Sequence, residues 1–185
     1  IKTEEEFLRD YEETRRETDP NFGSFSIFKN KRNEKLQLMV KEKIVGSKDE
    51  VYALLSKCEA RGKIKGQNVA PLVEVCCTPL KQLCSTSFRV LIGHEMHDYT
   101  LERLLRQRKT YTKQGAPTFS EDDCWGIFGD LTRGVRSFEE RGVLHGDVQP
   151  CNVFVLGDKT LKLVDSCFIN GQESAFARRY NELSY

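Results

Sequence analysis

The sequence has almost no net charge and no long apolar run. Its 185 residues include 29 basic and 28 acidic side chains, which gives a formal net charge of +1. Binding to a nucleic acid or to an anionic membrane surface would therefore gain little long-range electrostatic help. No apolar stretch approaches the roughly 20 residues that a bilayer-spanning helix needs. We therefore expect no nucleic-acid partner and no membrane segment.

Regular cysteine spacing is also missing. The seven cysteines are odd in number and include no C-x-x-C pair. Such usage favours reduced thiols and an intracellular, cytoplasmic location over a disulfide framework. A zinc site that combines Cys76, Cys77 and Cys84 with His94 and His97 is disfavoured, because the spacing fits no usual zinc pattern. The first ten residues are acidic, so we expect no secretory signal in them.

What is present is typical of a folded globular chain. Hydrophobic residues make up 38% and charged residues 31%, and the 11 Phe, six Tyr and single Trp are spread along the chain. This is too aromatic for a disordered chain. The length suggests one domain.

The first half is predicted to be rich in β-structure. Residues 1–18 are predicted to form a short amphipathic helix that packs on the rest, or a solvated lead-in. Over 22–44 apolar side chains alternate on either side of a basic tip, as in a β-hairpin. A short helix is predicted over 49–61. Further strands are predicted over 72–77 and 88–92.

The second half is predicted to be helical and to end in a hairpin. A basic helix opens at Leu101, and a longer one begins at a capping-box-like Ser120 and Asp123 and runs to Gly142. A hairpin follows over 153–164. Close packing against a neighbour is expected to explain three glycines inside the longer helix, at positions 126, 129 and 134.

The stretch H-G-D-V-Q-P-C-N, from His145 to Asn152, is the most informative part of the sequence. It places an acid, Asp147, five residues before the amide of Asn152, and a second acid, Asp165, follows the hairpin. Because the hairpin carries the chain out and back, the three can converge, although singly each could be a turn residue or a cap. Phosphoryl transfer needs a carboxylate that orients the attacking hydroxyl and oxygen ligands for Mg²⁺. The pattern therefore indicates phosphoryl transfer.

These motifs resemble the catalytic loop and the magnesium motif of the eukaryotic protein kinase family. The resemblance implies that Asp147 is the catalytic aspartate and that Asn152 and Asp165 bind Mg²⁺. It implies an α+β, protein-kinase-like fold with a small β-rich N-lobe and the first part of a helical C-lobe. The implied boundaries are an N-terminal extension over 1–21, the N-lobe and hinge over 22–97, and a partial C-lobe over 98–185 that stops within the activation segment.

The same resemblance implies a set of ATP-binding residues. The L-M-V-K sequence that ends at Lys41 resembles V-A-I-K, so Lys41 would bind the α- and β-phosphates and Glu50 would be its ion-pair partner. Glu95 and His97 would offer backbone groups of the hinge to the adenine. Gly23 is the one glycine kept where the glycine-rich loop should be.

Several positions depart from the family pattern. Lys41 and Glu50 are close in sequence, so the intervening helix is short or the partner is Glu42 or Glu59. Three other positions also differ from the family pattern. Gly146 replaces the arginine of H-R-D, and Gln149 replaces the lysine that would neutralise the transferred phosphate. Ser166-Cys167 replaces the Phe-Gly of D-F-G.

Three functions are compatible with these features. The first is a protein kinase that moves the ATP γ-phosphate to a Ser or Thr hydroxyl of a protein substrate, as the D-x-x-P pattern ending at Pro150 suggests. The second is a pseudokinase, a binding or scaffold module, which the departures favour. The third is a small-molecule phosphotransferase, because H-G-D followed by Asn also resembles aminoglycoside and choline kinase relatives. The stretch 175–185 resembles an activation segment and favours the protein kinase.

Overall fold

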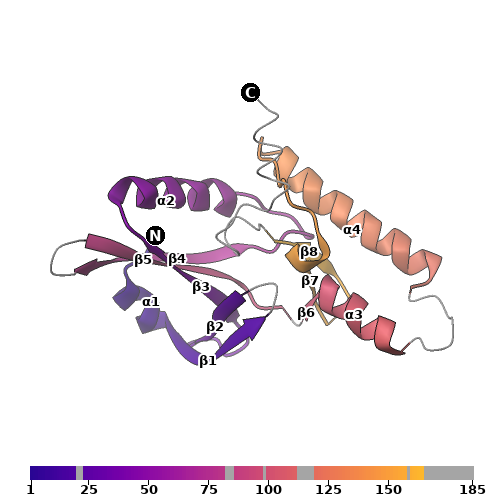
Figure 1. Cartoon of the computed structure of the whole chain (residues 1–185), viewed down its shortest axis with the longest axis horizontal. Coiled ribbons are helices and arrows are strands. Elements are labelled where there is room, and N and C mark those ends of the chain that lie inside the picture. The colour runs from indigo at the N-terminus through magenta and orange to yellow at the C-terminus, as the bar shows by residue number, and fades with distance from the viewer. Residues whose placement is uncertain (20–22, 82–85, 98, 112–118, 158, 165–185) are drawn as a thin grey trace. The chain divides into compact units, whose positions relative to one another are not determined.

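The computed structural model describes residues 1–19, 23–81, 86–97, 99–111, 119–157 and 159–164. The described chain is an α+β protein with a five-stranded antiparallel sheet, four α-helices and a small three-stranded sheet (Figure 1). This confirms the expected α+β class. The chain divides into two compact units, Ile1–Lys63 with Pro71–Met96, and Ile64–Ala70 with the described residues from His97 onward.

The first unit is built on the five-stranded sheet, whose strand order is β1-β2-β3-β5-β4. The predicted hairpin over 22–44 is confirmed, with Ile27 opposite Met39 in the register of β2 and β3. The strands predicted over 72–77 and 88–92 are also confirmed and are longer than expected. The strands are β1 (Tyr11–Asp19), β2 (Gly23–Asn30), β3 (Gln37–Val45), β4 (Leu72–Lys81) and β5 (Thr86–Glu95).

The short helix predicted within residues 1–18 is confirmed, but it is followed by a strand that the sequence did not predict. Helix α1 covers only Glu4–Asp10, and the chain then enters the edge strand β1. Beyond Tyr11, the described side chains of β1 are exposed. An edge strand with polar side chains on both faces shows no apolar alternation, so its sequence carries no strand pattern.

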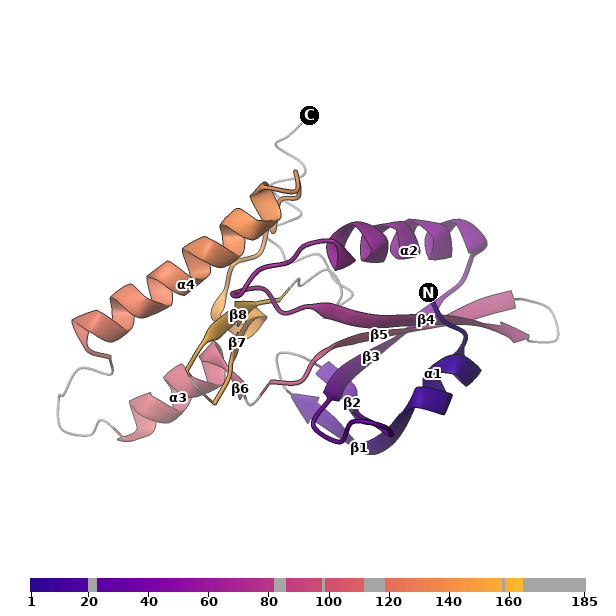
Figure 2. The ribbon, with the colours of Figure 1, turned by 180° about the vertical axis from the view of Figure 1, so that it is seen from behind.

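Helix α1 closes a hydrophobic core on one face of this sheet. Phe7 is 1% exposed, stacks on Tyr11 and meets Phe28 edge-on, with ring centroids 5.0 Å apart in both pairs. A capping box between Thr3 and Glu6 begins the helix. Figure 2 shows α1 and α2 on opposite faces of the sheet. The N-terminal helix is therefore part of the core of the first unit.

Helix α2 (Lys48–Gly62) confirms the helix predicted over 49–61. It begins at Ser47, whose side chain accepts a hydrogen bond from the Glu50 N–H. Its buried side chains are Val51 and Cys58, whose spacing puts them on the same face of the helix. This apolar stripe packs the helix against the sheet.

Two buried thiols in the first unit should resist alkylation. Burial raises the pKa of both Cys58 and Cys76 to about 11, and only the thiolate is a strong nucleophile. At pH 8 we therefore expect iodoacetamide to modify the exposed Cys124 and to spare Cys58 and Cys76. Peptide mass spectrometry checks this, with urea-unfolded protein as the control in which all three react. Rapid labelling of Cys58 in the native chain would show that its burial is wrong.

The second unit places a long helix against the small sheet of order β6-β7-β8. The predicted helices and hairpin are confirmed, and the capping box of Ser120 and Asp123 begins α4 as expected. Within the described residues, no helix is long and apolar enough to cross a membrane. The elements are β6 (Tyr99–Thr100), α3 (Leu101–Tyr111), α4 (Glu121–Glu139), the 3₁₀ turn η1 (Pro150–Asn152), β7 (Val153–Val155) and β8 (Leu161–Leu163).

One of the three glycines of α4 is explained by close packing. A Cβ at Gly134 would lie 2.8 Å from the Asn68 carbonyl oxygen and 3.2 Å from the Cβ of Leu163. Such a contact is too short, so only glycine lets the helix approach the segments it packs on. Gly126 has no atom near its added Cβ, and Gly129 meets only the Arg133 side chain. For these two positions the packing explanation was wrong.

Candidate functional site

The candidate site lies in the loop that joins α4 to β7. Residues 143–149 have no regular secondary structure and lead into η1 (Figure 1). Gly146 has φ +75°, in the left-handed region that glycine adopts without steric cost. Nothing lies within 4 Å of a Cβ built there. Backbone conformation, and not space, is therefore what favours glycine at the position where the family pattern has Arg.

His145 braces this loop. Its Nε2 lies 2.9 Å from the carbonyl oxygen of Val164, and the backbone N–H of Asp147 donates to its Nδ1 at 3.2 Å. A backbone N–H can only donate, so Nδ1 is the acceptor and Nε2 carries the proton. The ring also meets Phe138 edge-on at 4.9 Å. With both ring nitrogens engaged, His145 serves as a structural support.

Asp147 and Asn152 come together as the spacing predicted. Asn152 is fully buried, and its Nδ2 donates to Oδ2 of Asp147 at 2.8 Å and to the Asp147 carbonyl oxygen at 3.0 Å. Asp147 is itself only 7% exposed. Gln149 adds a third contact, because its Nε2 donates to the same Oδ2 at 3.0 Å. A carboxylate and an amide are thus held in one small, buried network.

The end of the β7–β8 hairpin is tied to the same network. The Val164 N–H donates to the Asn152 carbonyl oxygen at 2.9 Å, and the Asn152 N–H donates to the Gln149 carbonyl oxygen at 2.8 Å. Val164 directly precedes Asp165, which lies outside the described residues. The convergence of Asp165 with the other two therefore stays a prediction.

The donor set of this loop suits a hard cation. The Nδ2 of Asn152 donates to Asp147, and its amide oxygen Oδ1 accepts only a weak hydrogen bond from the Cys151 thiol, with Sγ 3.8 Å away. Mg²⁺ binds few protein oxygens and completes its shell with water and phosphate oxygens. No group of three or more His, Cys, Asp or Glu side chains gathers among the described residues. An amide oxygen that has only a weak thiol donor, beside a carboxylate, is therefore a donor set that Mg²⁺ accepts.

Lys41 is a buried lysine in the first unit. It lies on the central strand β3 opposite Ile92 of β5 and is 7% exposed. Lysine is almost never buried unless its charge is paired. Its burial distinguishes Lys41 from an ordinary solvated lysine on a basic strand.

Glu50 lies at the exposed start of α2. Its Oε2 accepts a hydrogen bond from the Gly46 N–H at 3.3 Å. The alternatives are also engaged, because Glu42 pairs with Arg89 at 2.8 Å and Glu59 with Lys63 at 3.0 Å. Of the described side chains of α2, the buried ones are apolar or thiol. No acidic residue described in this helix is therefore buried against the sheet.

The other predicted ATP-binding residues lie at strand ends or just beyond them. Gly23 is the first residue of β2, opposite Asp19. Glu95 ends β5, and its backbone N–H donates to the Pro71 carbonyl oxygen at 3.3 Å. The His97 ring, in the second unit, stacks on Phe154 with centroids 3.5 Å apart.

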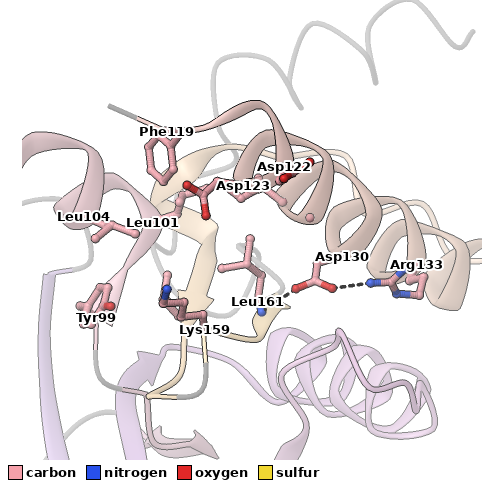
Figure 3. A pocket seen from close by; sticks show the side chains of 13 residues that line it. Tyr99, Leu101, Leu104, Phe119, Asp122, Asp123, Asp130, Arg133, Lys159 and Leu161 are labelled. Atoms are coloured by element: carbon pink, nitrogen blue, oxygen red, sulfur yellow. Dashed lines mark hydrogen bonds and ion pairs between the residues drawn. The ribbon is translucent and has the colours of Figure 1, made fainter. Parts of the chain in front are cut away.

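A separate cavity of about 360 Å³ lies between α3, α4 and the small sheet (Figure 3). Its lining includes Leu101 and Leu161 and no residue of the loop 143–152. Asp130, at its edge, accepts from the Leu161 N–H at 2.9 Å and pairs with Arg133 at 2.5 Å. That carboxylate holds α4 to β8, and the cavity is separate from the loop that carries Asp147 and Asn152.

A scan of the sequence against models of known protein families finds no match.

Proposed function

We propose that this chain is a protein-kinase-like phosphotransferase, which moves the γ-phosphate of ATP to a Ser or Thr hydroxyl of a protein substrate with Mg²⁺. The observation that carries this proposal is the buried contact between Asp147 and Asn152, 2.8 Å from Oδ2 to Nδ2. It brings together a carboxylate that can orient a hydroxyl and an amide oxygen that can bind Mg²⁺.

The proposed reaction divides between these residues. The substrate hydroxyl oxygen forms a bond to the γ-phosphorus, and the bond from that phosphorus to the β–γ bridging oxygen breaks, which releases ADP. Asp147 would orient the hydroxyl and receive its proton. Asn152 and Asp165 would hold Mg²⁺, which when bound neutralises charge on the phosphate oxygens.

Lys41 would bind the α- and β-phosphates as a point charge. Its burial on β3 supports this role, because it sets Lys41 apart from an exposed, solvated lysine. The exposed position of Glu50 means that this glutamate does not support Lys41 from the buried face of α2.

A pseudokinase is the second candidate. The observations in its favour are the absence of a buried acid among the described residues of α2 and the neutral Gln149 beside Asp147. Such a chain could bind nucleotide without useful transfer. Binding and transfer therefore have to be measured separately.

Mg-ATP should stabilise the full chain against heat. At a nucleotide concentration near 100 times Kd, mass action contributes about 2.7 kcal/mol, which for a chain of this size raises Tm by on the order of 5 to 10 °C. Asp165→Ala should abolish the shift, whereas Asp122→Ala, at an exposed position on α4, should keep it. Differential scanning fluorimetry with Mg-ATP, and with ATP plus a chelator, measures both. No shift at millimolar Mg-ATP would contradict nucleotide binding.

A further inference from the structure

We infer that Gln149 is a positioning residue of the catalytic loop. Its side chain holds the carboxylate of Asp147 so that Oδ1 faces the substrate hydroxyl. This inference rests on the proposed function. Gln149 occupies the position where the family pattern has a cation, and its side chain is turned to the carboxylate of Asp147.

Two amide donors share one oxygen of Asp147. Gln149 Nε2 reaches Oδ2 at 3.0 Å and Asn152 Nδ2 reaches it at 2.8 Å. The donors come from opposite ends of η1, since Gln149 precedes its first residue and Asn152 is its last. A carboxylate oxygen has about two lone-pair sites. Oδ2 is therefore fully used, and Oδ1 is the oxygen that can accept a proton.

Gln149 and Asn152 differ in what else they hold. Asn152 is fully buried and also bonds the Asp147 carbonyl oxygen, so it supports the loop backbone. Gln149 is half-buried, and it makes no side-chain cap to η1. Within the described loop, the side-chain amide of Gln149 donates to the carboxylate of Asp147 and to no backbone group. Gln149 can therefore be changed without removing the support of the backbone.

The amide acts here by geometry and not by charge. Gln supplies an N–H donor at the reach needed for Oδ2 but brings no positive charge to the phosphate. Glu has the same length and cannot donate, and its charge would repel Asp147. Lys restores a donor and adds the missing charge. Gln149→Glu therefore removes the hydrogen-bond donor, whereas Gln149→Lys keeps a donor and adds a positive charge.

Steady-state transfer from labelled ATP tests this inference. A hydrogen bond to a charged group contributes about 1.5–3 kcal/mol, so Gln149→Glu should lower kcat by on the order of 10- to 100-fold. KM for ATP should stay within about twofold, because the Gln149 amide is committed to Oδ2 of Asp147 and the expected loss is in the chemical step. Gln149→Lys should restore kcat to the wild-type value or above. Gln107→Glu, the same change at an exposed position on α3, should leave both constants unchanged.

The outcomes separate this inference from the proposed function. Wild-type transfer with an unchanged kcat in Gln149→Glu would overturn the inference and leave the function standing. Absence of wild-type transfer would overturn both. A double-mutant cycle of Gln149→Leu with Asp147→Leu, followed by urea unfolding, measures the contact without turnover. Lack of coupling between the two substitutions would overturn the inference even in an active chain.

Discussion

Asp147→Asn should lower the rate of phosphoryl transfer by about 10²- to 10⁴-fold, the usual contribution of a positioned general base. The reason lies in the two donors on Oδ2, from Gln149 and Asn152. An introduced amide would turn its oxygen toward both donors. Its NH₂ group would then replace Oδ1, so a donor would meet the substrate hydroxyl where an acceptor is needed. The loop would keep its shape and lose its base.

This result needs a readout of folding beside the readout of rate. Asp147→Asn should keep the Mg-ATP melting shift, because it retains the hydrogen bonds that hold Asn152. Asp122→Asn, on the exposed first turn of α4, controls for the loss of one negative charge. Transfer at the wild-type rate in Asp147→Asn, measured with γ-labelled ATP, would remove Asp147 from the reaction.

Phe7→Ala should destabilise the first unit by about 3–5 kcal/mol, the range for large aromatic side chains in cores. Phe7 is 1% exposed and touches the rings of Tyr11 and Phe28. Its loss would leave a cavity between α1 and the sheet. The expected fall in the midpoint of thermal unfolding is on the order of 6 to 20 °C.

The adjacent residue offers a matched control for this cavity. Leu8 lies on the same helix but is 42% exposed. Leu8→Ala should therefore change the free energy of unfolding by well under half as much as Phe7→Ala. Urea unfolding followed by circular dichroism compares the two variants. Equal effects would mean that α1 does not cover the core.

Other contacts also tie the N-terminal residues to the sheet. Lys2 forms a parallel bridge with Cys76 of the edge strand β4 and an ion pair of 2.7 Å with Glu74. Glu4 pairs with Arg89 of β5 at 2.6 Å. Such partly exposed pairs contribute little stability individually. Burial of the Phe7 side chain therefore stabilises the attachment of α1 more than these ion pairs do.

The sequence predicted the elements whose signals are local. Helices α2 and α4 and the hairpin of β7 and β8 have short-range periodicity, and Ser120 with Asp123 marks the start of α4. Strand β1 was missed because its polar side chains give no alternation, and its pairing with β2 is a property of the sheet.

The sequence by itself determined which residues could do chemistry. The spacing from Asp147 to Asn152 allows one turn of chain to bring the carboxylate and the amide together. The burial of Lys41, the exposure of Glu50 and the donation from Gln149 to Asp147 were decided only by the tertiary structure. The physical reason is that burial and hydrogen-bond direction depend on neighbours from distant segments. Residues nearby in the sequence do not specify those neighbours.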